Sequence, residues 1–337
     1  MKIMITGGAG FVASHLVDLC LKNGDKVIGT VRWNEDLSRL NKNIKVEYCE
    51  LTDLSSLIRA INKHRPDVIS HLAAQSWVPY SFDNPIYTME VNAIGTLNIL
   101  EAVRIIREID NYNVVHRQFT EHQPPEYNPL IHICSSSEFY GKVPKDKQPI
   151  TESHAASPMN PYGVGKVGAD LMAQLYEKYY DMRILITRMF THTGPRRTMM
   201  SAECFYAKRI AEIEKIWNEE AVFKIPIGNM KSIRTWRDVR DAVKDYYALF
   251  KDGKTGIYNI SGDTQKSIQE VLDYLLSISS LNRKNIELVE VPNLLRKVDV
   301  DLQLTDISKF KKEIYQEKEF SFEQTMRDLL EYWRENV

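Results

Sequence analysis

Residues 6–13 read Thr-Gly-Gly-Ala-Gly-Phe-Val-Ala and join two segments of different character. The segment before them, Lys2–Thr6, is a short apolar run typical of a strand, and the segment after them, Phe11–Leu21, has apolar residues at helical spacing. In such a turn Gly7 permits the tight bend, and Gly10 lets the backbone approach a pyrophosphate. A glycine cluster alone is weak evidence, but its place between a strand and a helix at the start of the chain predicts dinucleotide binding.

The start of this predicted helix supplies further contacts to a dinucleotide. Backbone N–H groups in the first turn, at Phe11 and Val12, lack partners within a helix, and the helix dipole has its positive end there. Both features attract phosphate. We therefore expect Gly7, Gly10, Phe11 and Val12 to bind the cofactor.

Strand-like and helical segments alternate up to about residue 190. The further strand-like runs are Lys26–Val31, Ile44–Tyr48, Asp67–Leu72, Leu130–Cys134 and Ile184–Arg188. The helical patterns between them include Ser55–Asn62, Met89–Arg107 and Tyr162–Tyr180. This order predicts an α/β fold with a Rossmann-type, doubly wound parallel sheet that binds ligands at the carboxyl ends of its strands.

The pattern changes after Arg188, where we expect a smaller, interleaved C-terminal substrate lobe. The predicted dinucleotide-binding domain comprises 1–190 with 235–262 returning to it, and the lobe comprises 191–234 and 263–337. Ser267-Ile-Gln-Glu270 is typical of a capping box that opens a helix through Leu276. Asp110–Asn128 is interpreted as a surface insertion of unknown purpose.

Composition excludes several classes of protein. Among 337 residues, 44 Lys and Arg balance 45 Asp and Glu, so no strong field favours nucleic acid as a partner. The apolar runs are too short to span a membrane, and the start of the chain does not resemble a signal peptide. The four cysteines are scattered, so we expect a reduced, cytoplasmic protein with no disulfide framework and no metal site.

We expect residues at the ends of the second, third and fourth predicted strands to contact the adenosine half of the cofactor. An acidic residue after the second strand would favour NAD, but Arg32 stands there, which favours NADP through a 2′-phosphate. NAD stays an alternative, because Arg32 is otherwise a solvated surface residue. The residues expected to line the adenine and the cofactor backbone are Glu50, Leu51, Leu72, Ala73, Ala74, Gln75 and Ser76.

A tyrosine and a lysine four residues apart, Tyr162 and Lys166, share one face of a predicted helix. Tyrosine ordinarily ionises near pH 10, and a neighbouring ammonium favours the phenolate that a base requires. Tyr247 and Lys251 have the same spacing, and we interpret them as an ordinary helix face. Context favours the first pair, because Tyr162 follows Pro161 at a helix start.

Polar residues also follow the buried strand that ends near Cys134. Ser136 is placed to hydrogen-bond a substrate hydroxyl or the phenol of Tyr162, and Glu138 puts a carboxylate where ligands are expected. The alternative for Glu138 is a solvated loop side chain. We predict Ser136, Glu138, Tyr162 and Lys166 as the catalytic residues.

These motifs resemble the extended short-chain dehydrogenase/reductases that act on nucleotide sugars. Within them the chain is most similar to the GDP-mannose 4,6-dehydratases, especially the bacterial GDP-manno-heptose 4,6-dehydratases, over essentially its whole length. The resemblance rests on Thr6–Phe11, Val31–Trp33, Leu72–Ser76, Ser81–Phe82, Val91–Thr96, Ile131–Gly141, Tyr162–Lys166, Thr191–Arg197, Arg234–Trp236 and Arg296–Asp299.

The resemblance implies an internal redox reaction that gives a 4-keto-6-deoxy sugar. Tyr162 would take the O4 proton while the C4 hydride passes to NADP. Glu138 would then remove the C5 proton, and water would leave from C6 near Ser136 or Glu138, before the hydride returns to C6. The resemblance also implies cofactor contacts from Tyr87, Tyr162, Lys166, His192 and Arg197, and substrate contacts from Ser81, Glu138, Thr191, Arg234 and Arg296.

Three departures from the family pattern leave the sugar open. Thr191 stands where asparagine is usual, Lys297 where proline is usual, and Arg32-Trp33 where many members have two arginines. The alternatives are a GDP-4-keto-6-deoxy-sugar reductase, a C4 dehydrogenase or epimerase, and a non-catalytic NADP-binding protein. We expect a nucleotide sugar, GDP-linked, as the partner, and a homodimer or homotetramer with no nucleic acid and no membrane.

Overall fold

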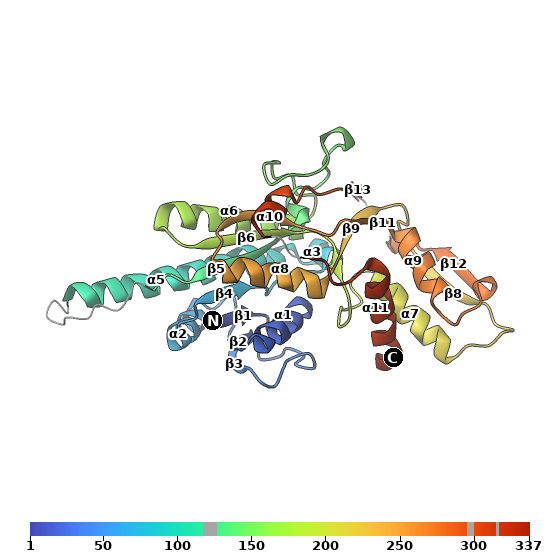
Figure 1. Cartoon of the computed structure of the whole chain (residues 1–337), viewed down its shortest axis with the longest axis horizontal. Helices are drawn as coiled ribbons and strands as arrows, with labels where there is room; N and C mark the ends of the chain where they lie inside the picture. Colours follow the sequence, from blue (N-terminus) through green and yellow to red (C-terminus); the bar gives the residue numbers. More distant parts are fainter. Residues whose placement is uncertain (117–126, 295–299, 315–316) are drawn as a thin grey trace. The chain divides into compact units, whose positions relative to one another are not determined.

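The computed structural model of the protein describes residues 1–116, 127–294, 300–314 and 317–337 (Figure 1). These residues form two compact units. The first consists of Met1–Phe139, Ala156–Met189 and Val243–Tyr258, and the second of Tyr140–Ala155, Phe190–Ala242 and Asn259–Val337. Residues 140–155, 190, 235–242 and 259–262 therefore group with the second unit, whereas the sequence interpretation placed them in the dinucleotide-binding domain.

A seven-stranded sheet organises the first unit, in the order β10-β6-β5-β4-β1-β2-β3. The pairs from β3 across to β6 are parallel, and the chain turns from one half of the sheet to the other between β1 and β4. This is the predicted Rossmann-type order, with its switch point at β1 and β4. The strands are β1 (Lys2–Thr6), β2 (Lys26–Val31), β3 (Lys45–Tyr48), β4 (Val68–His71), β5 (Leu130–Ser136), β6 (Ile184–Met189) and β10 (Gly256–Ile260).

Helices of the first unit connect these strands. They are α1 (Phe11–Lys22), α2 (Leu54–His64), α3 (Val78–Asp83), α4 (Pro85–Met89), α5 (Gly95–His116), α6 (Pro161–Tyr180) and α8 (Val239–Lys251), the last beginning in the second unit. The helix predicted at Met89–Arg107 is part of a longer helical run, in which α4 ends at Met89, a π-helical turn spans Glu90–Ile94, and α5 continues to His116. Residues 117–126 of the predicted surface insertion lie outside the described part of the chain.

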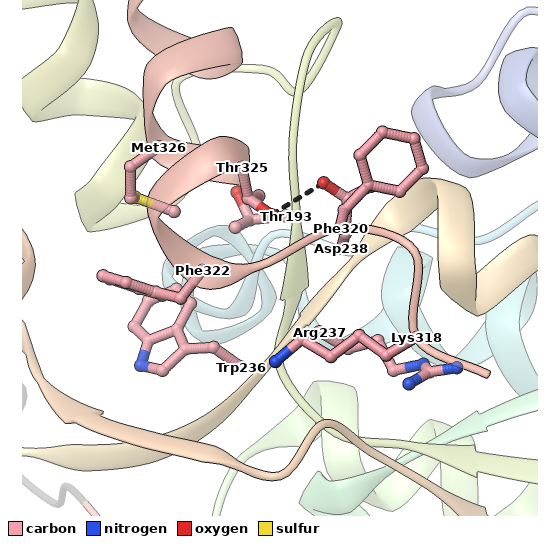
Figure 2. A pocket seen from close by; sticks show the side chains of 9 residues that line it. All are labelled: Thr193, Trp236, Arg237, Asp238, Lys318, Phe320, Phe322, Thr325 and Met326. Atoms are coloured by element: carbon pink, nitrogen blue, oxygen red, sulfur yellow. Dashed lines mark hydrogen bonds between the residues drawn. The ribbon is translucent and has the colours of Figure 1, made fainter.

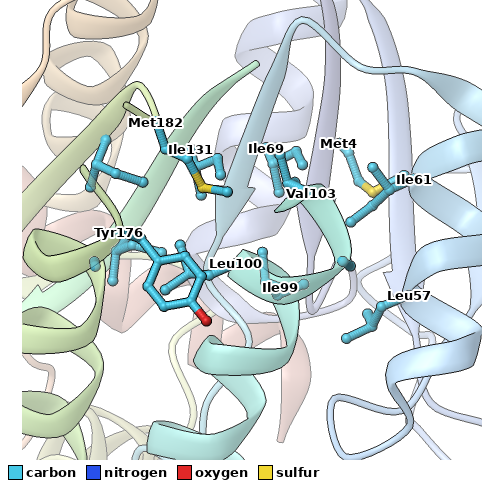
Figure 3. Close-up of a cluster of buried hydrophobic side chains, with 14 of the residues drawn as sticks. Met4, Leu57, Ile61, Ile69, Ile99, Leu100, Val103, Ile131, Tyr176 and Met182 are labelled. Carbon is cyan, nitrogen blue, oxygen red and sulfur yellow. The ribbon is translucent and has the colours of Figure 1, made fainter. Parts of the chain in front are cut away.

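One face of the sheet is buried under α2, α5 and α6. Figure 3 shows its core, in which Met4, Ile69 and Ile131, paired across β1, β4 and β5, share one apolar cluster with Leu100 of α5 and Tyr176 of α6. These residues lie on the same face of the sheet, and the residues next to them in each strand lie on the other face, because neighbouring residues of a strand point to opposite faces.

The opposite face carries α8. His132 lies between Ile131 and Ile133 and therefore points to that face. Its ring centre lies 4.8 Å from that of Tyr246 and 5.1 Å from that of Phe250, both in α8.

His71, the buried histidine of β4, is hydrogen-bonded through both of its ring nitrogens. Thr6 Oγ1 accepts from the N–H of Ala73 and lies 2.8 Å from His71 Nδ1, which accepts the Thr6 hydroxyl because the proton of the neutral ring is on Nε2. His71 Nε2 then donates to Thr96 Oγ1, whose hydroxyl donates to the carbonyl of Asn92. Burial lowers the pKa of His71 to about 3, and the cation of Lys166 adds to this effect. The imidazole is therefore neutral and links the glycine turn to the π-helical turn.

The second unit is built on two small sheets and a helical layer. β9 (Ile233–Asp238) pairs with β11 (Thr264–Ser267), β13 (Leu302–Gln303) and β7 (His192–Thr193), and β8 (Phe223–Ile227) pairs with β12 (Ile286–Glu290). Its helices are α7 (Ala202–Lys215), α9 (Ile268–Ser277), α10 (Ser308–Glu313) and α11 (Phe322–Asn336). Its short 3₁₀ turns are Lys145–Lys147, Arg283–Asn285 and Pro292–Leu294.

Helices α7, α9 and α11 bury a common apolar core that includes Ile210, Leu275 and Leu329. The predicted capping box at Ser267 and Glu270 is present at the start of α9.

A buried ion pair joins α6 to β6. Asp170 is fully buried, and its two carboxylate oxygens accept from Nε and Nη2 of Arg188 at 2.9 and 3.0 Å. Ser135 Oγ donates to the same carboxylate at 2.9 Å, and the Arg188 guanidinium lies 3.6 Å from the centre of the Phe139 ring. The pair therefore holds both sides of the segment that follows β5.

We expect Arg188→Met to lower the free energy of unfolding by roughly 3–5 kcal/mol, because it leaves the Asp170 carboxylate buried without its cation. Urea unfolding of both proteins at neutral pH measures this difference. Lys63→Met is the matched control, since Lys63 forms an exposed pair with Glu47 that should contribute less than about 1 kcal/mol. Equal losses in the two variants would contradict the assignment.

Candidate active site

The glycine turn between β1 and α1 is closely packed at three positions. Gly7 has a φ of 67°, in the left-handed region, and a Cβ there would lie 3.0 Å from the Cα of Ala73. A Cβ on Gly10 would lie 2.9 Å from the carbonyl oxygen of Gly7. Gly8 approaches the backbone of β2, where its added Cβ would lie 3.0 Å from the Cα of Gly29. Larger residues would therefore displace this turn.

The turn presents the start of α1 to a ligand. Gly10 is the N-cap, and within the described part of the chain no side chain caps α1 and no acidic residue lies in its first turn. The N-terminus of this twelve-residue helix at Phe11 and Val12 is thus left to an anion. A close backbone cradle and an uncapped helix end together fit the pyrophosphate of a dinucleotide.

Two arginines of the first unit contact this turn or another predicted cofactor residue. Arg32 follows β2, and its Nη1 donates to the hydroxyl of Tyr87 at 3.2 Å, which brings two of the predicted cofactor residues together. Arg39 Nε donates to the carbonyl of Ala9 within the glycine turn at 3.3 Å. Sequence reasoning missed Arg39, because nothing in the local pattern distinguishes it from a surface arginine.

The segment after β4, Leu72–Ser76, is held by paired amide hydrogen bonds. The N–H of Gln75 donates to Asn92 Oδ1 at 2.8 Å, and Asn92 Nδ2 donates to the carbonyl of Gln75 at 2.9 Å. The N–H of Ala73 donates to Thr6 Oγ1. Asn92, in the π-helical turn, therefore fixes the strand end that the sequence assigned to the cofactor.

The predicted adenine contacts come from the loop after β3. The carbonyl of Leu51 accepts from Asn98 Nδ2 at 2.7 Å, and the Leu51 Cβ would lie 2.8 Å from a Cβ built on Gly95. Glu50 lies next to it, and its carbonyl accepts from the N–H of Asp53. This loop is therefore packed against the start of α5.

The tyrosine and lysine lie in the first turns of α6. Lys166 is 8% exposed, and its Nζ donates to the carbonyl of Cys134 in β5 at 2.7 Å. The same Nζ lies 5.9 Å from the centre of the Tyr162 ring. Burial lowers the pKa of Lys166. The helical spacing therefore does bring the ammonium beside the phenol.

Glu138 and Ser136 lie just beyond these residues, at the end of β5. Ser136 is 9% exposed, and its Oγ accepts from the N–H of Glu138 at 3.2 Å. Glu138 Oε2 accepts from Asn160 Nδ2 at 2.8 Å. Because α6 packs on β5, the four predicted catalytic residues share the carboxyl edge of the sheet with the glycine turn.

Ser81 is placed differently from the other predicted residues of the first unit. It is fully buried in α3, and its Oγ donates to the carbonyl of Val78 at 2.6 Å. Its hydroxyl hydrogen is therefore engaged within the helix.

The second unit contains the remaining described candidates. His192 Nδ1 lies 3.1 Å from the carbonyl of Phe190, and the carbonyl of Thr191 accepts from the N–H of Arg237. Arg197 Nε donates to Ser201 and lies 3.0 Å from the carboxylate of the buried Glu203.

Arg234, in β9, donates from Nη1 to the carbonyl of Ile233 at 3.0 Å. Arg296 lies outside the described residues.

A small pocket lies within the second unit beside β9 and the start of α11 (Figure 2). Aromatic side chains and the cations of Arg237 and Lys318 line it, and Thr325 donates to Asp238 across it at 2.7 Å. Its lining includes none of the predicted site residues. Among the described residues we also find no cluster of metal-binding side chains, and no helix is long and apolar enough to cross a bilayer.

The family described as GDP-mannose 4,6 dehydratase matches residues 4–329. The GDP-mannose 4,6-dehydratase of Yersinia enterocolitica is 31% identical over 80% of this chain and 69% of that protein. The GDP-6-deoxy-D-mannose reductase of Pseudomonas aeruginosa is 26% identical over 100% of this chain and 98% of that protein.

The solved structure of RMD from Pseudomonas aeruginosa complexed with NADPH superposes with a TM-score of 0.79 at 23% identity, covering all of both chains. This likeness confirms the predicted fold. Since the family match spans nearly the entire sequence, the chain belongs to the GDP-mannose 4,6 dehydratase family.

Proposed function

We propose that the protein is a GDP-sugar 4,6-dehydratase, which converts GDP-mannose or GDP-manno-heptose to the 4-keto-6-deoxy sugar. The observation that carries this proposal is the Glu138 carboxylate, held by Asn160 at the same sheet edge as Ser136, Tyr162 and Lys166. Oxidation of a sugar alcohol needs one base, but elimination of water needs a second group to take a proton from carbon.

The residues divide between these two proton transfers. The Tyr162 phenolate takes the proton of the O4 hydroxyl, with Lys166 as the neighbouring cation. Glu138 takes the proton from C5, which the adjacent ketone has made acidic. Ser136 lies beside the hydroxyl that leaves C6 as water. A bound nicotinamide would hold the C4 hydride until it returns to C6. Of the two protons taken from O4 and C5, one is made up on the departing C6 hydroxyl and one at C5 when the hydride returns, so the net change is loss of one water.

We propose NADP as this cofactor, with Gly7, Gly10 and the start of α1 on its pyrophosphate. Arg32 and Arg39, which contact Tyr87 and the glycine turn respectively, supply positive charge suited to a 2′-phosphate. The NADPH complex of the similar Pseudomonas aeruginosa structure supports a nicotinamide cofactor. NAD is the alternative.

A GDP-4-keto-6-deoxy-sugar reductase is the second candidate, favoured by the similarity to the GDP-6-deoxy-D-mannose reductase over the entire chain. Reduction of a ketone uses the same tyrosine and lysine but consumes one reduced cofactor per turnover. The two candidates therefore differ in their demand for NADPH.

We also propose that α6 contributes to a homodimer. Leu171, Leu175 and Tyr179 lie along one side of this helix and are 51%, 51% and 76% exposed. Their spacing makes a continuous apolar stripe, which burial in the core of one protomer does not explain.

Incubation of the purified protein with GDP-mannose or GDP-manno-heptose should give a product lighter by one water without added NADPH, because the hydride is returned in each cycle. Mass spectrometry measures the product. Turnover that requires a keto substrate and stoichiometric NADPH would identify the reductase instead.

Tyr162→Phe should lower kcat by about 10³-fold or more, because general base catalysis of the first proton transfer is lost. Cofactor binding, followed by quenching of intrinsic fluorescence, should persist. A variant with unchanged kcat would remove Tyr162 from its assigned role.

Glu138→Gln should block elimination more than oxidation at C4, since the amide cannot take the C5 proton. We expect reduced cofactor and an unreduced-C6 4-keto sugar to accumulate, detected by nicotinamide absorbance and mass spectrometry. Normal dehydration by this variant would contradict the assignment of Glu138.

A further inference from the structure

We infer that Asn160 is a positioning residue that fixes the Glu138 carboxylate to the helix turn carrying Tyr162. This inference rests on the proposed function, because it concerns the residue assigned to the C5 proton. It adds a residue outside the predicted catalytic set.

Both the oxygen and the nitrogen of the Asn160 side-chain amide form hydrogen bonds. It is the N-cap of α6, and its Oδ1 accepts from the N–H of Gly163 at 2.8 Å. Its Nδ2 donates to Glu138 Oε2, also at 2.8 Å. Tyr162 lies between the cap and Gly163, so one amide group joins the carboxylate to the turn that bears the phenol.

The orientation of this amide is determined by its partners. A backbone N–H can only donate, so it must face the amide oxygen of Asn160. The NH₂ group is then directed at Glu138, where an ionised carboxylate can only accept. A serine, threonine or aspartate would cap the helix equally well through an oxygen, but only an amide also offers a fixed N–H donor at this reach.

The backbone around this contact leaves little freedom. A Cβ on Gly163 would lie 2.8 Å from the carbonyl oxygen of Glu138, so the first turn of α6 touches the backbone of the catalytic segment. Glu138 is only partly buried. Its backbone position is thus set by packing, and the Asn160 amide selects where the longer side chain points. Misplacing a catalytic group by about 1 Å can cost roughly 10²-fold in rate.

Asn160→Asp separates the two roles of the side chain, because it retains an oxygen for the helix cap and replaces the donor with a second carboxylate. We expect its melting temperature to stay close to wild type while product formation falls about 10²-fold. Oxidation at C4 should continue, so reduced nicotinamide should accumulate. Deuterium incorporation at C5 in D₂O should fall with product formation, because it reports the step assigned to Glu138.

Two further variants distinguish positioning from helix stability. Asn160→Ala should show the same elimination defect and also lose about 1 kcal/mol of stability with the cap. Ser321→Ala is the matched control, because Ser321 Oγ caps α11 in the second unit by accepting from the N–H of Gln324. It should lose similar stability and keep wild-type turnover.

The outcomes separate this inference from the proposed function. If the wild-type protein dehydrates neither sugar, the proposed function fails. If the wild type dehydrates its substrate and Asn160→Asp forms product and exchanges C5 at wild-type rates, the positioning role is wrong. A variant that slows oxidation and elimination equally would also overturn it, because loss of the Glu138 contact alone should spare oxidation.

Discussion

The buried pair of Asp170 and Arg188 is the interaction on which the site depends. Tyr162, Lys166 and Asp170 follow one another at four-residue intervals, so they lie on one face of α6. That face carries the proposed chemistry at its first turn and is anchored at its third by the ion pair. The same carboxylate accepts from Ser135, and the same guanidinium lies over Phe139, so the two ends of the Ser136–Glu138 segment are held by one charge pair.

Much of the first unit follows from its sequence, because short apolar strands alternate there with amphipathic helices. The glycine turn, six parallel strands and the Tyr162–Lys166 pair could all be predicted from local spacing. The second unit was harder, since strands such as β9 and β11 are short and contain polar residues that carry no clear alternation. The limits of the two units also differ from the predicted domain limits. Residues 140–155 follow β5 of the main sheet in sequence but belong to the second unit.

Parts of the candidate site needed the tertiary structure. Asn160 before Pro161 has the local appearance of a helix cap, and its bond to Glu138 spans 22 residues of sequence. Arg39 reaches the glycine turn from a surface loop in the same way. The π-helical turn that places Asn92 against Gln75 has no signature in apolar periodicity. Each of these contacts joins segments that only the fold brings together, so local patterns could not reveal them.

The near contact of Gly8 and Gly29 couples the glycine turn to the second strand of the sheet. The hydrogen bond from the N–H of Gly8 to the carbonyl of Thr30 reinforces this coupling at 2.8 Å. A chimaera that received the cofactor loop of another enzyme would therefore have to import the matching glycine of the second strand with it. Exchange of the cofactor loop in this protein therefore involves two segments of the chain, the glycine turn and β2.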